Sequence, residues 1–136
     1  MPYSAREMFQ LVDDVEAYPQ FLPWCSSAQV TSLDGDTMEA ALELHKGNLS
    51  KSFTTRNRRR EHDSIDIALV GGPFRHLQGG WRFEDLGEDG SRVSLNLDFE
   101  FDSLLVDLAI GGFFEETCNS LVDAFTRRAA ALYGER

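Results

Sequence analysis

Hydrophobic and polar residues alternate along the middle of the chain, from about residue 26 to residue 102. In the clearest run, every odd position from Val93 to Phe101 is apolar. A period of two with one apolar face is typical of an antiparallel sheet whose other face is exposed to solvent. Gly79 and Gly80 indicate a bulge or bend in one long strand. We predict six strands, over about residues 26–33, 38–46, 49–60, 63–70, 74–86 and 91–101.

Near the N-terminus the pattern changes to a helical period. Ser4 and Glu7 have the spacing of a capping box, in which each side chain bonds the other residue's free backbone N–H. An apolar stripe at helical spacing follows, so we predict a helix over about residues 4–14. Two prolines then break the pattern, and residues 18–24 indicate a short helical turn and an aromatic-rich loop.

The last thirty residues predict a second, longer helix. From about residue 112 to 133 it would be roughly 33 Å long, and Gly111 with Gly112 marks a kink or its start. Because a sheet with one apolar face needs a cover, we predict an α+β fold in which a curved antiparallel sheet wraps around this helix. The apolar face of the helical segment is predicted to include Leu104, Leu105, Leu108, Cys118, Leu121, Val122, Phe125, Ala129 and Leu132.

Length and charge limit the class of protein. The 136 residues predict one domain, and the net charge of −10 opposes binding to DNA or generic binding to RNA. No apolar run reaches the roughly 18 residues of a membrane helix, and no basic stretch leads into an apolar one near the N-terminus. We therefore expect a cytoplasmic protein in which both cysteines, Cys25 and Cys118, are free thiols.

Side chains with catalytic or metal-binding chemistry do not gather in the sequence. His45, His62 and His76 lie at wide spacings, and neither cysteine has a partner at the spacing of a zinc site. No nucleophile elbow or phosphate loop is present. The neighbouring acids Glu115 and Glu116 are better explained as a solvated first helical turn. We expect no metal, no cofactor and no catalysis.

The predicted architecture leaves room for an apolar ligand. A curved sheet around one helix need not fill its concave side, and such interiors are typical places for ligand cavities. For any single residue, core packing is the more frequent reason for burial, so this prediction rests on the architecture. From strand and helix phase we predict cavity residues Met38, Leu42, Leu44, Ile67, Leu69, Trp81, Phe83, Leu105, Leu108 and Phe113, with Phe21, Trp24 and Phe74 at the cavity mouth.

A series of short segments follows in order along nearly the whole chain. They include Pro-Tyr-Ser-Ala at 2–5, Phe-Leu-Pro-Trp-Cys at 21–25, Trp-Arg-Phe at 81–83 and Leu-Asp-Phe-Glu-Phe at 97–101. Further segments are 11–19, 53–56, 72–74, Leu77 and 124–129. Together these segments resemble the coenzyme Q-binding / ribosome association toxin (RatA) family of the START-like superfamily. The resemblance implies a helix-grip fold, in agreement with the periodicity.

The resemblance also implies two functions. The first is non-catalytic binding of ubiquinone or a related isoprenoid lipid in support of respiration, with transient contact at the inner membrane. The alternative is a toxin-like protein that binds the large ribosomal subunit and blocks subunit association. The candidate ribosome contacts are Arg56, Arg58, Arg59 and Arg60. The alternative interpretation is that these arginines are solvent-exposed positions of a strand with no partner role. Helix-grip relatives include cyclases, so the fold alone does not exclude an enzyme.

One feature departs from the family pattern. The family usually has a further strand before the Pro-Tyr-Ser-Ala segment, beside its last strand, whereas here Met1 directly precedes Pro2. Without that first strand, the predicted strand 91–101 has an open edge, and an open edge invites pairing with another chain. We therefore expect an oligomer or aggregate formed through this edge.

Overall fold

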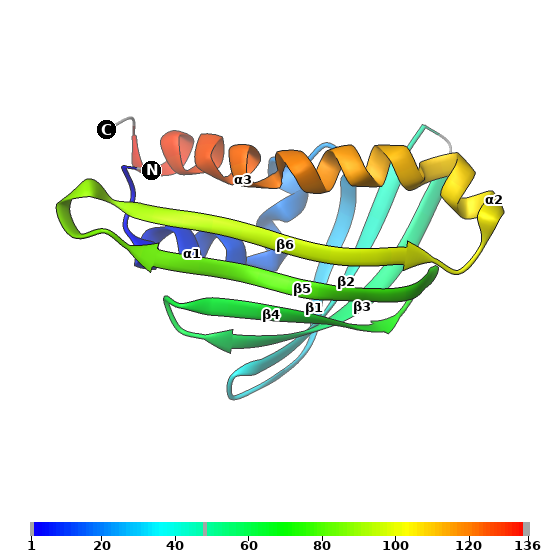
Figure 1. The fold of residues 1–136 in the computed structure, drawn as a ribbon, viewed down its shortest axis with the longest axis horizontal. Coiled ribbons are helices and arrows are strands. Elements are labelled where there is room, and N and C mark those ends of the chain that lie inside the picture. Colours follow the sequence, from blue (N-terminus) through cyan, green and yellow to red (C-terminus); the bar gives the residue numbers. More distant parts are fainter. Residues whose placement is uncertain (1, 48, 135–136) are drawn as a thin grey trace.

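The computed structural model describes residues 2–47 and 49–134. Its six strands form one antiparallel sheet in chain order, β1-β2-β3-β4-β5-β6 (Figure 1). The predicted strands are confirmed, with every boundary within one residue of its prediction. The strands are β1 (Cys25–Asp34), β2 (Thr37–Lys46), β3 (Leu49–Arg60), β4 (Ser64–Gly71), β5 (Phe74–Asp85) and β6 (Ser91–Phe101). β6 is an edge strand of the described sheet, and its pairing with another chain stays a prediction.

Helices precede and follow the sheet. The predicted capping box is confirmed, because the Ser4 hydroxyl accepts the Glu7 backbone N–H and the Glu7 carboxylate accepts that of Ser4, at 3.1 and 3.0 Å. No helix in the described ranges is long and apolar enough to cross a membrane. The helices are α1 (Ala5–Asp13), the 3-10 helices η1 (Val15–Gln20) and η2 (Gly87–Asp89), α2 (Leu104–Val106), the π-helix η3 (Asp107–Gly111) and α3 (Gly112–Tyr133).

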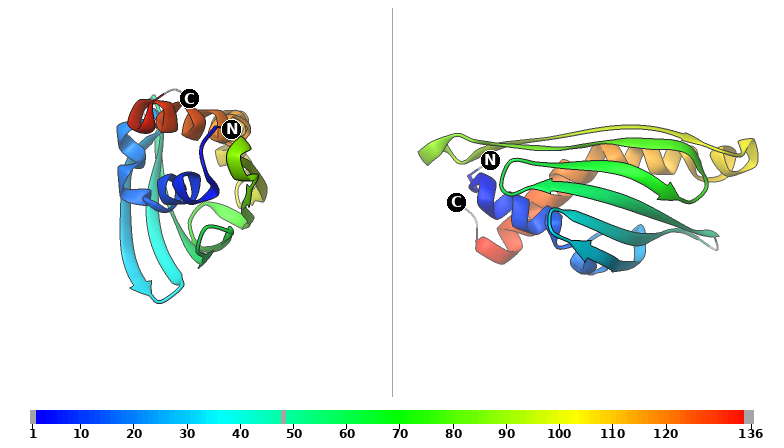
Figure 2. Two further views of the ribbon diagram at one scale, coloured as in Figure 1. Left: turned by 90° about the vertical axis from the view of Figure 1, so that its left-hand side faces the viewer. Right: turned by 90° about the horizontal axis from the view of Figure 1, so that it is seen from below.

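The predicted arrangement of a curved sheet around a long helix is confirmed. α3 runs along the concave side of the sheet, and α1 lies within the curve beside the C-terminal part of α3 (Figure 2). Two hydrogen bonds hold this end of the fold together. The Tyr3 hydroxyl donates to the Gly134 carbonyl at 2.8 Å, and the Ser91 hydroxyl donates to the Tyr3 carbonyl at 2.7 Å.

Aromatic side chains hold α3 against the sheet at two places. Towards its C-terminal end, the buried Phe125 ring lies 5.3 Å from Trp81 and 5.4 Å from Tyr18, between ring centroids. Towards its N-terminal end, the buried Phe114 ring lies 5.4 Å from Phe74 and 4.8 Å from Phe99. These two contacts belong to two separate clusters of the core.

The glycine pair in β5 does not form the predicted bulge. Gly79 and Gly80 pair in unbroken register with β6, and the register shift of this strand lies between Phe74 and His76. Gly79 has a φ of +151°, and a Cβ atom there would collide with the backbone of Asn96. The glycine is therefore explained by close approach of two strands.

The segment before α3 is where the predicted helix phase is wrong. Leu105 and Leu108, predicted to line the cavity, are 78% and 75% exposed, and Leu104 and Leu132 are exposed too. The cause is η3, because a π-helical turn adds a residue to the turn and rotates every position before it relative to α3. Ile110 therefore faces the sheet in place of the predicted leucines.

We predict that Phe125→Ala lowers the free energy of unfolding by about 3–5 kcal/mol, because it removes a buried ring from the contact between α3 and the sheet. The matched control is Leu132→Ala, since Leu132 lies on the same helix and is 52% exposed. This control should change the stability by less than about 0.5 kcal/mol. Urea unfolding followed by far-ultraviolet circular dichroism measures both, and equal effects would contradict the packing described.

Candidate ligand-binding cavity

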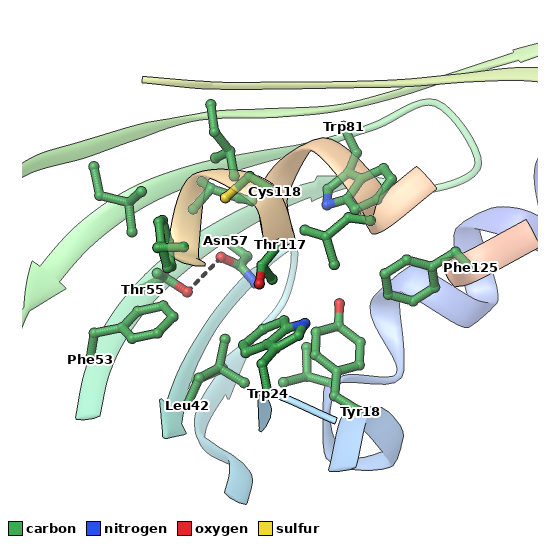
Figure 3. A pocket seen from close by; sticks show the side chains of 17 residues that line it. Tyr18, Trp24, Leu42, Phe53, Thr55, Asn57, Trp81, Thr117, Cys118 and Phe125 are labelled. Carbon is green, nitrogen blue, oxygen red and sulfur yellow. Dashed lines mark hydrogen bonds between the residues drawn. The ribbon is translucent and has the colours of Figure 1, made fainter. Parts of the chain in front are cut away.

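An apolar cavity of about 80 Å³ lies between the concave face of the sheet and α3, between the two aromatic contacts (Figure 3). Both tryptophans of the chain line it. Its wall comes from η1, the following loop, strands β2 to β6 and α3. The lining residues are Val15, Tyr18, Trp24, Ala40, Leu42, Phe53, Thr55, Asn57, Ile67, Leu77, Trp81, Leu97, Phe114, Thr117, Cys118, Leu121 and Phe125.

Part of the predicted site lies in this lining. Leu42, Ile67 and Trp81 line the cavity, and so does Trp24 from the predicted mouth. The alternation in the strands predicted their inward orientation because successive side chains of a strand point to opposite faces.

Other predicted cavity residues point inward but belong to the packed core. Met38 packs with Val15 and Ala40 in a small separate cluster. Leu44 and Leu69 belong to the cluster of Phe74 and Phe114, and Phe83 packs against Phe9 and Trp81. The period of a strand gives the face of each residue but not its position along the strand relative to the two aromatic contacts.

The remaining predicted aromatic residues lie outside the lining. Phe113 is half-buried beneath Lys46, whose Nζ lies 5.3 Å from the ring centroid. Phe21 packs against Phe125 on the outer side and carries the Arg128 guanidinium over its ring at 4.9 Å. Phe74 is buried and stacked on Phe101 at 4.7 Å.

Sequence reasoning missed the polar part of the lining. Thr55 and Asn57 are 4% and 9% exposed, and the Thr55 hydroxyl donates to Asn57 Oδ1 at 3.0 Å. The signal was present in the strand period, because both residues share odd numbering with the buried Phe53. A search for apolar inward residues does not find them, because both side chains are polar. Thr117 on α3, 8% exposed, completes the buried polar group.

The cavity offers binding chemistry and no acid–base chemistry. None of the described lining residues is an Asp, Glu, His, Lys or Arg. Burial raises the pKa of the Cys118 thiol to about 12 and also raises the pKa of the Tyr18 phenol, which donates a hydrogen bond to the Val12 carbonyl. Both groups are neutral near pH 7. No cluster of three or more potential metal ligands occurs within residues 2–47 and 49–134.

A second hollow adjoins the cavity along the seam between β6 and α3. Leu97 and Cys118 line both spaces, so these two side chains form the partition between them. The outer hollow measures about 230 Å³ and also includes Phe99 and Glu115. Displacement of the partition would connect the cavity to solvent on this side.

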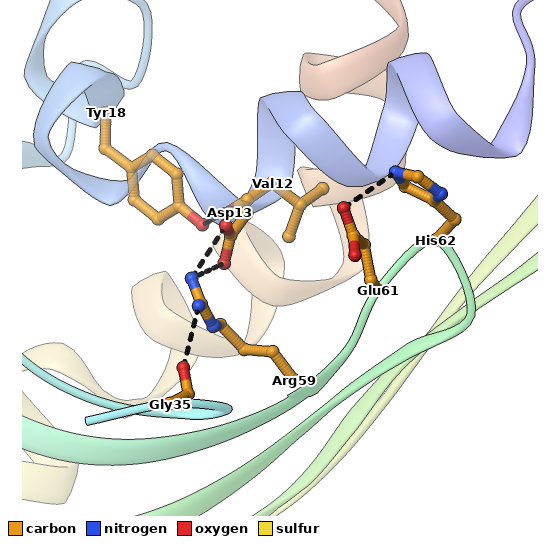
Figure 4. A network of polar contacts seen from close by, with 7 residues as sticks. All are labelled: Val12, Asp13, Tyr18, Gly35, Arg59, Glu61 and His62. Carbon is orange, nitrogen blue, oxygen red and sulfur yellow. Dashed lines mark hydrogen bonds and ion pairs between the residues drawn. The ribbon is translucent and has the colours of Figure 1, made fainter. Parts of the chain in front are cut away.

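The four predicted ribosome contacts do not form one patch. Arg59 points inward, where its Nη1 bonds both carboxylate oxygens of Asp13 at 3.1 and 2.9 Å and its Nη2 bonds the Gly35 carbonyl (Figure 4). Arg56 is paired with Glu39 at 2.7 Å. Arg58 and Arg60 are exposed on the outer face of β3. The strand period is the reason, because it places Arg59 on the opposite face from the other three.

Arg59 joins β3 to α1 at the end of the sheet. Burial raises the pKa of the Asp13 carboxyl despite the guanidinium beside it, and this guanidinium has a buried Nε without a partner in the described chain. The ion pair therefore fixes the position of α1. In this conformation the Arg59 guanidinium is engaged within the fold and is not available to contact a ribosome.

Solved structures with the same architecture show the fold. The Zhui aromatase/cyclase from a Streptomyces species superimposes with a TM-score of 0.81 at 15% identity, covering 99% of this chain and 93% of that one. A START superfamily protein from Mycobacterium smegmatis superimposes with a TM-score of 0.80 at 23% identity, over 97% and 93% of the two chains. The predicted START-like helix-grip fold is thereby confirmed.

Sequence comparison then gives the family. The chain belongs to the polyketide cyclase / dehydrase and lipid transport family, which it matches over residues 1–126. It is 45% identical over 136 residues to the ribosome association toxin RatA of Escherichia coli K12, covering 100% of this chain and 86% of that protein. It is 30% identical over 139 residues to the mitochondrial coenzyme Q-binding protein COQ10 homolog B of Xenopus laevis, covering 98% and 57%. The expected resemblance is confirmed.

We predict that both thiols react slowly with iodoacetamide, because the thiolate is the reactive form and burial raises the pKa values of Cys25 and Cys118 to about 11 and 12. At pH 8 the native protein should react at least tenfold more slowly than an ordinary thiol of pKa near 8.5. The rates should rise about tenfold per pH unit from 7 to 9. Mass spectrometry of the alkylated protein measures this, with urea-unfolded protein as the control; fast native labelling would contradict the burial.

Proposed function

We propose that this protein binds a hydrophobic quinone or isoprenoid lipid, such as ubiquinone, in the cavity between the sheet and α3. It acts without catalysis, as a carrier in support of respiration. The observation that carries the proposal is the cavity itself, whose lining is apolar and lacks any ionisable acid or base among the described residues. The identity to a protein named as coenzyme Q-binding supports this choice of ligand.

The driving force would be burial of the ligand's apolar carbons. Each buried CH₂ group contributes about 0.8 kcal/mol, so one isoprene unit contributes about 4 kcal/mol when it is fully shielded from water. Trp24, Trp81 and Phe53 supply flat apolar surfaces that suit a quinone ring. The tail supplies affinity, and polar groups in the lining orient the head.

Binding requires the cavity to enlarge. Its volume of about 80 Å³ is below the roughly 150 Å³ of a cavity that holds benzene, and below the roughly 300 Å³ at which ordinary ligand pockets begin. The partition of Leu97 and Cys118 is the wall that separates this space from a larger hollow. We therefore place the ligand's access route at the seam of β6 and α3.

The first test is mass spectrometry of an organic extract from protein purified without detergent. We expect a stoichiometric quinone that is absent from an equal amount of an unrelated soluble protein from the same cells. A fluorescence titration accompanies it, because both tryptophans line the cavity and a quinone should quench their emission saturably. An empty extract together with a flat titration would overturn the proposal.

A matched pair of variants locates the binding. Ala40 lines the cavity, whereas its neighbour Ala41 has the opposite strand phase and faces outward. Ala40→Leu adds three carbon atoms to the cavity wall and should weaken binding of a ubiquinone analogue at least tenfold, while Ala41→Leu should leave it unchanged. Equal binding by both variants would place the ligand elsewhere on the protein.

A second candidate function is binding to the large ribosomal subunit. Relatives from Escherichia coli, Shigella flexneri and Vibrio cholerae carry the name ribosome association toxin. The observation that favours it is 45% identity over the whole chain. Because the net charge is −10, contact with RNA would have to be local. Arg58 and Arg60 are the candidate contacts because they are exposed on the outer face of the sheet.

We predict cosedimentation with the large subunit at moderate salt, and a several-fold loss of bound protein for Arg58→Ala/Arg60→Ala. Loss of two phosphate contacts should also reduce the salt dependence of binding. Arg6→Ala is the control, because Arg6 is an exposed arginine on α1, a different element from the one that carries Arg58 and Arg60. Failure of the unaltered protein to cosediment even at low salt would remove this function.

A further inference from the structure

Three buried polar groups gather in the otherwise apolar cavity. Thr55 and Asn57 come from β3 and Thr117 from α3, and all three are at least nine-tenths buried. Figure 3 shows Asn57 with its amide directed between the hydroxyls of the two threonines. Buried polar groups in proteins are almost always hydrogen-bonded to protein or to water, so polar atoms that open onto the cavity are available to a ligand.

The hydrogen bond from Thr55 fixes what the subsite offers. Because the Thr55 hydroxyl donates to Asn57 Oδ1 at 3.0 Å, the oxygen of this amide is engaged and its Nδ2 remains as a donor. Within the described chain, Nδ2 of Asn57 and the hydroxyl of Thr117 have no hydrogen-bond partner. The indole N–H of Trp81, 4% exposed on the same lining, has no acceptor there either.

We propose that Asn57, Thr117 and Trp81 form a subsite that recognises a carbonyl oxygen on the head of the ligand. This inference rests on the proposed function and adds a specificity. Asn57 Nδ2 and Trp81 Nε1 are groups that only donate, and the Thr117 hydroxyl can donate or accept. An acceptor-only oxygen, as in a quinone, satisfies such a subsite.

The same chemistry discriminates between the redox states of the ligand. A quinone carries carbonyl oxygens that accept hydrogen bonds, whereas the corresponding quinol carries hydroxyl groups that must also donate. The unpaired groups of the subsite include no group that only accepts. A quinol would therefore bury hydroxyl donors for which the subsite supplies few acceptors, and burial of an unpaired donor is unfavourable. The oxidised form is the preferred ligand.

The test compares ubiquinone carrying one isoprene unit with its quinol, by titration calorimetry under anaerobic conditions. We expect the oxidised form to bind at least tenfold more tightly, which corresponds to one hydrogen bond of ordinary strength. Thr55→Val/Asn57→Leu should weaken binding of the oxidised form about tenfold and abolish the preference. Because this pair of changes removes both partners of a hydrogen bond at nearly constant shape, the fold should survive.

The controls separate the subsite from the cavity. Thr54→Val removes a hydroxyl from the outer face of the same strand and should leave both affinities unchanged. Thr117→Val is a second test within the cavity that does not disturb β3, and it should reduce the preference several-fold. Equal affinities for the two redox forms would overturn the subsite and leave the proposed function standing. Absence of binding by either form would overturn the proposed function as well.

Discussion

The contact of one straight helix with a curved sheet is the constraint from which the other features of this structure follow. α3 meets the sheet through Phe125 at one end and Phe114 at the other, each surrounded by rings of the sheet or the loops. Between these contacts the helix presents Thr117, Cys118 and Leu121, whose side chains are shorter than an aromatic ring. The space left between them is the cavity. It is a consequence of the architecture and needs no special residue to create it.

The sequence predicted the strands closely because their inner faces are apolar over long stretches and each turn carries glycine or aspartate. The helix phase failed at one place for a definite reason. The segment from Leu104 to Leu108 has an apolar pattern that continues into α3, but the π-helical turn at Asp107–Gly111 breaks the phase between them. Nothing in a period of 3.6 residues signals an added residue, so Leu105 and Leu108 were assigned to the wrong face.

The inner face of β3 explains why the cavity residues were harder to predict than the fold. Along this strand the inward positions change from apolar to polar to charged, from Phe53 through Thr55 and Asn57 to Arg59. A search for inward residues by hydrophobicity finds only the first. The same alternation separates Arg59 from its neighbouring arginines, so that one of four basic residues anchors α1 through Asp13 while the others stay on the outer face.

The two ends of α3 are held by different contacts, and this difference bears on the proposed enlargement of the cavity. The C-terminal half is fixed by Phe125 and by α1, which the Arg59–Asp13 pair attaches to the sheet. The N-terminal half follows η3 and the exposed leucines of α2 and is held by Phe114, and there Leu97 and Cys118 line both the cavity and the outer hollow. Movement of the N-terminal half would leave the cluster around Phe125 intact but would disturb the ring contacts of Phe114. In the proposed enlargement from this side, Asn57 and Trp81 stay in place on the strands, whereas Thr117 moves with the helix.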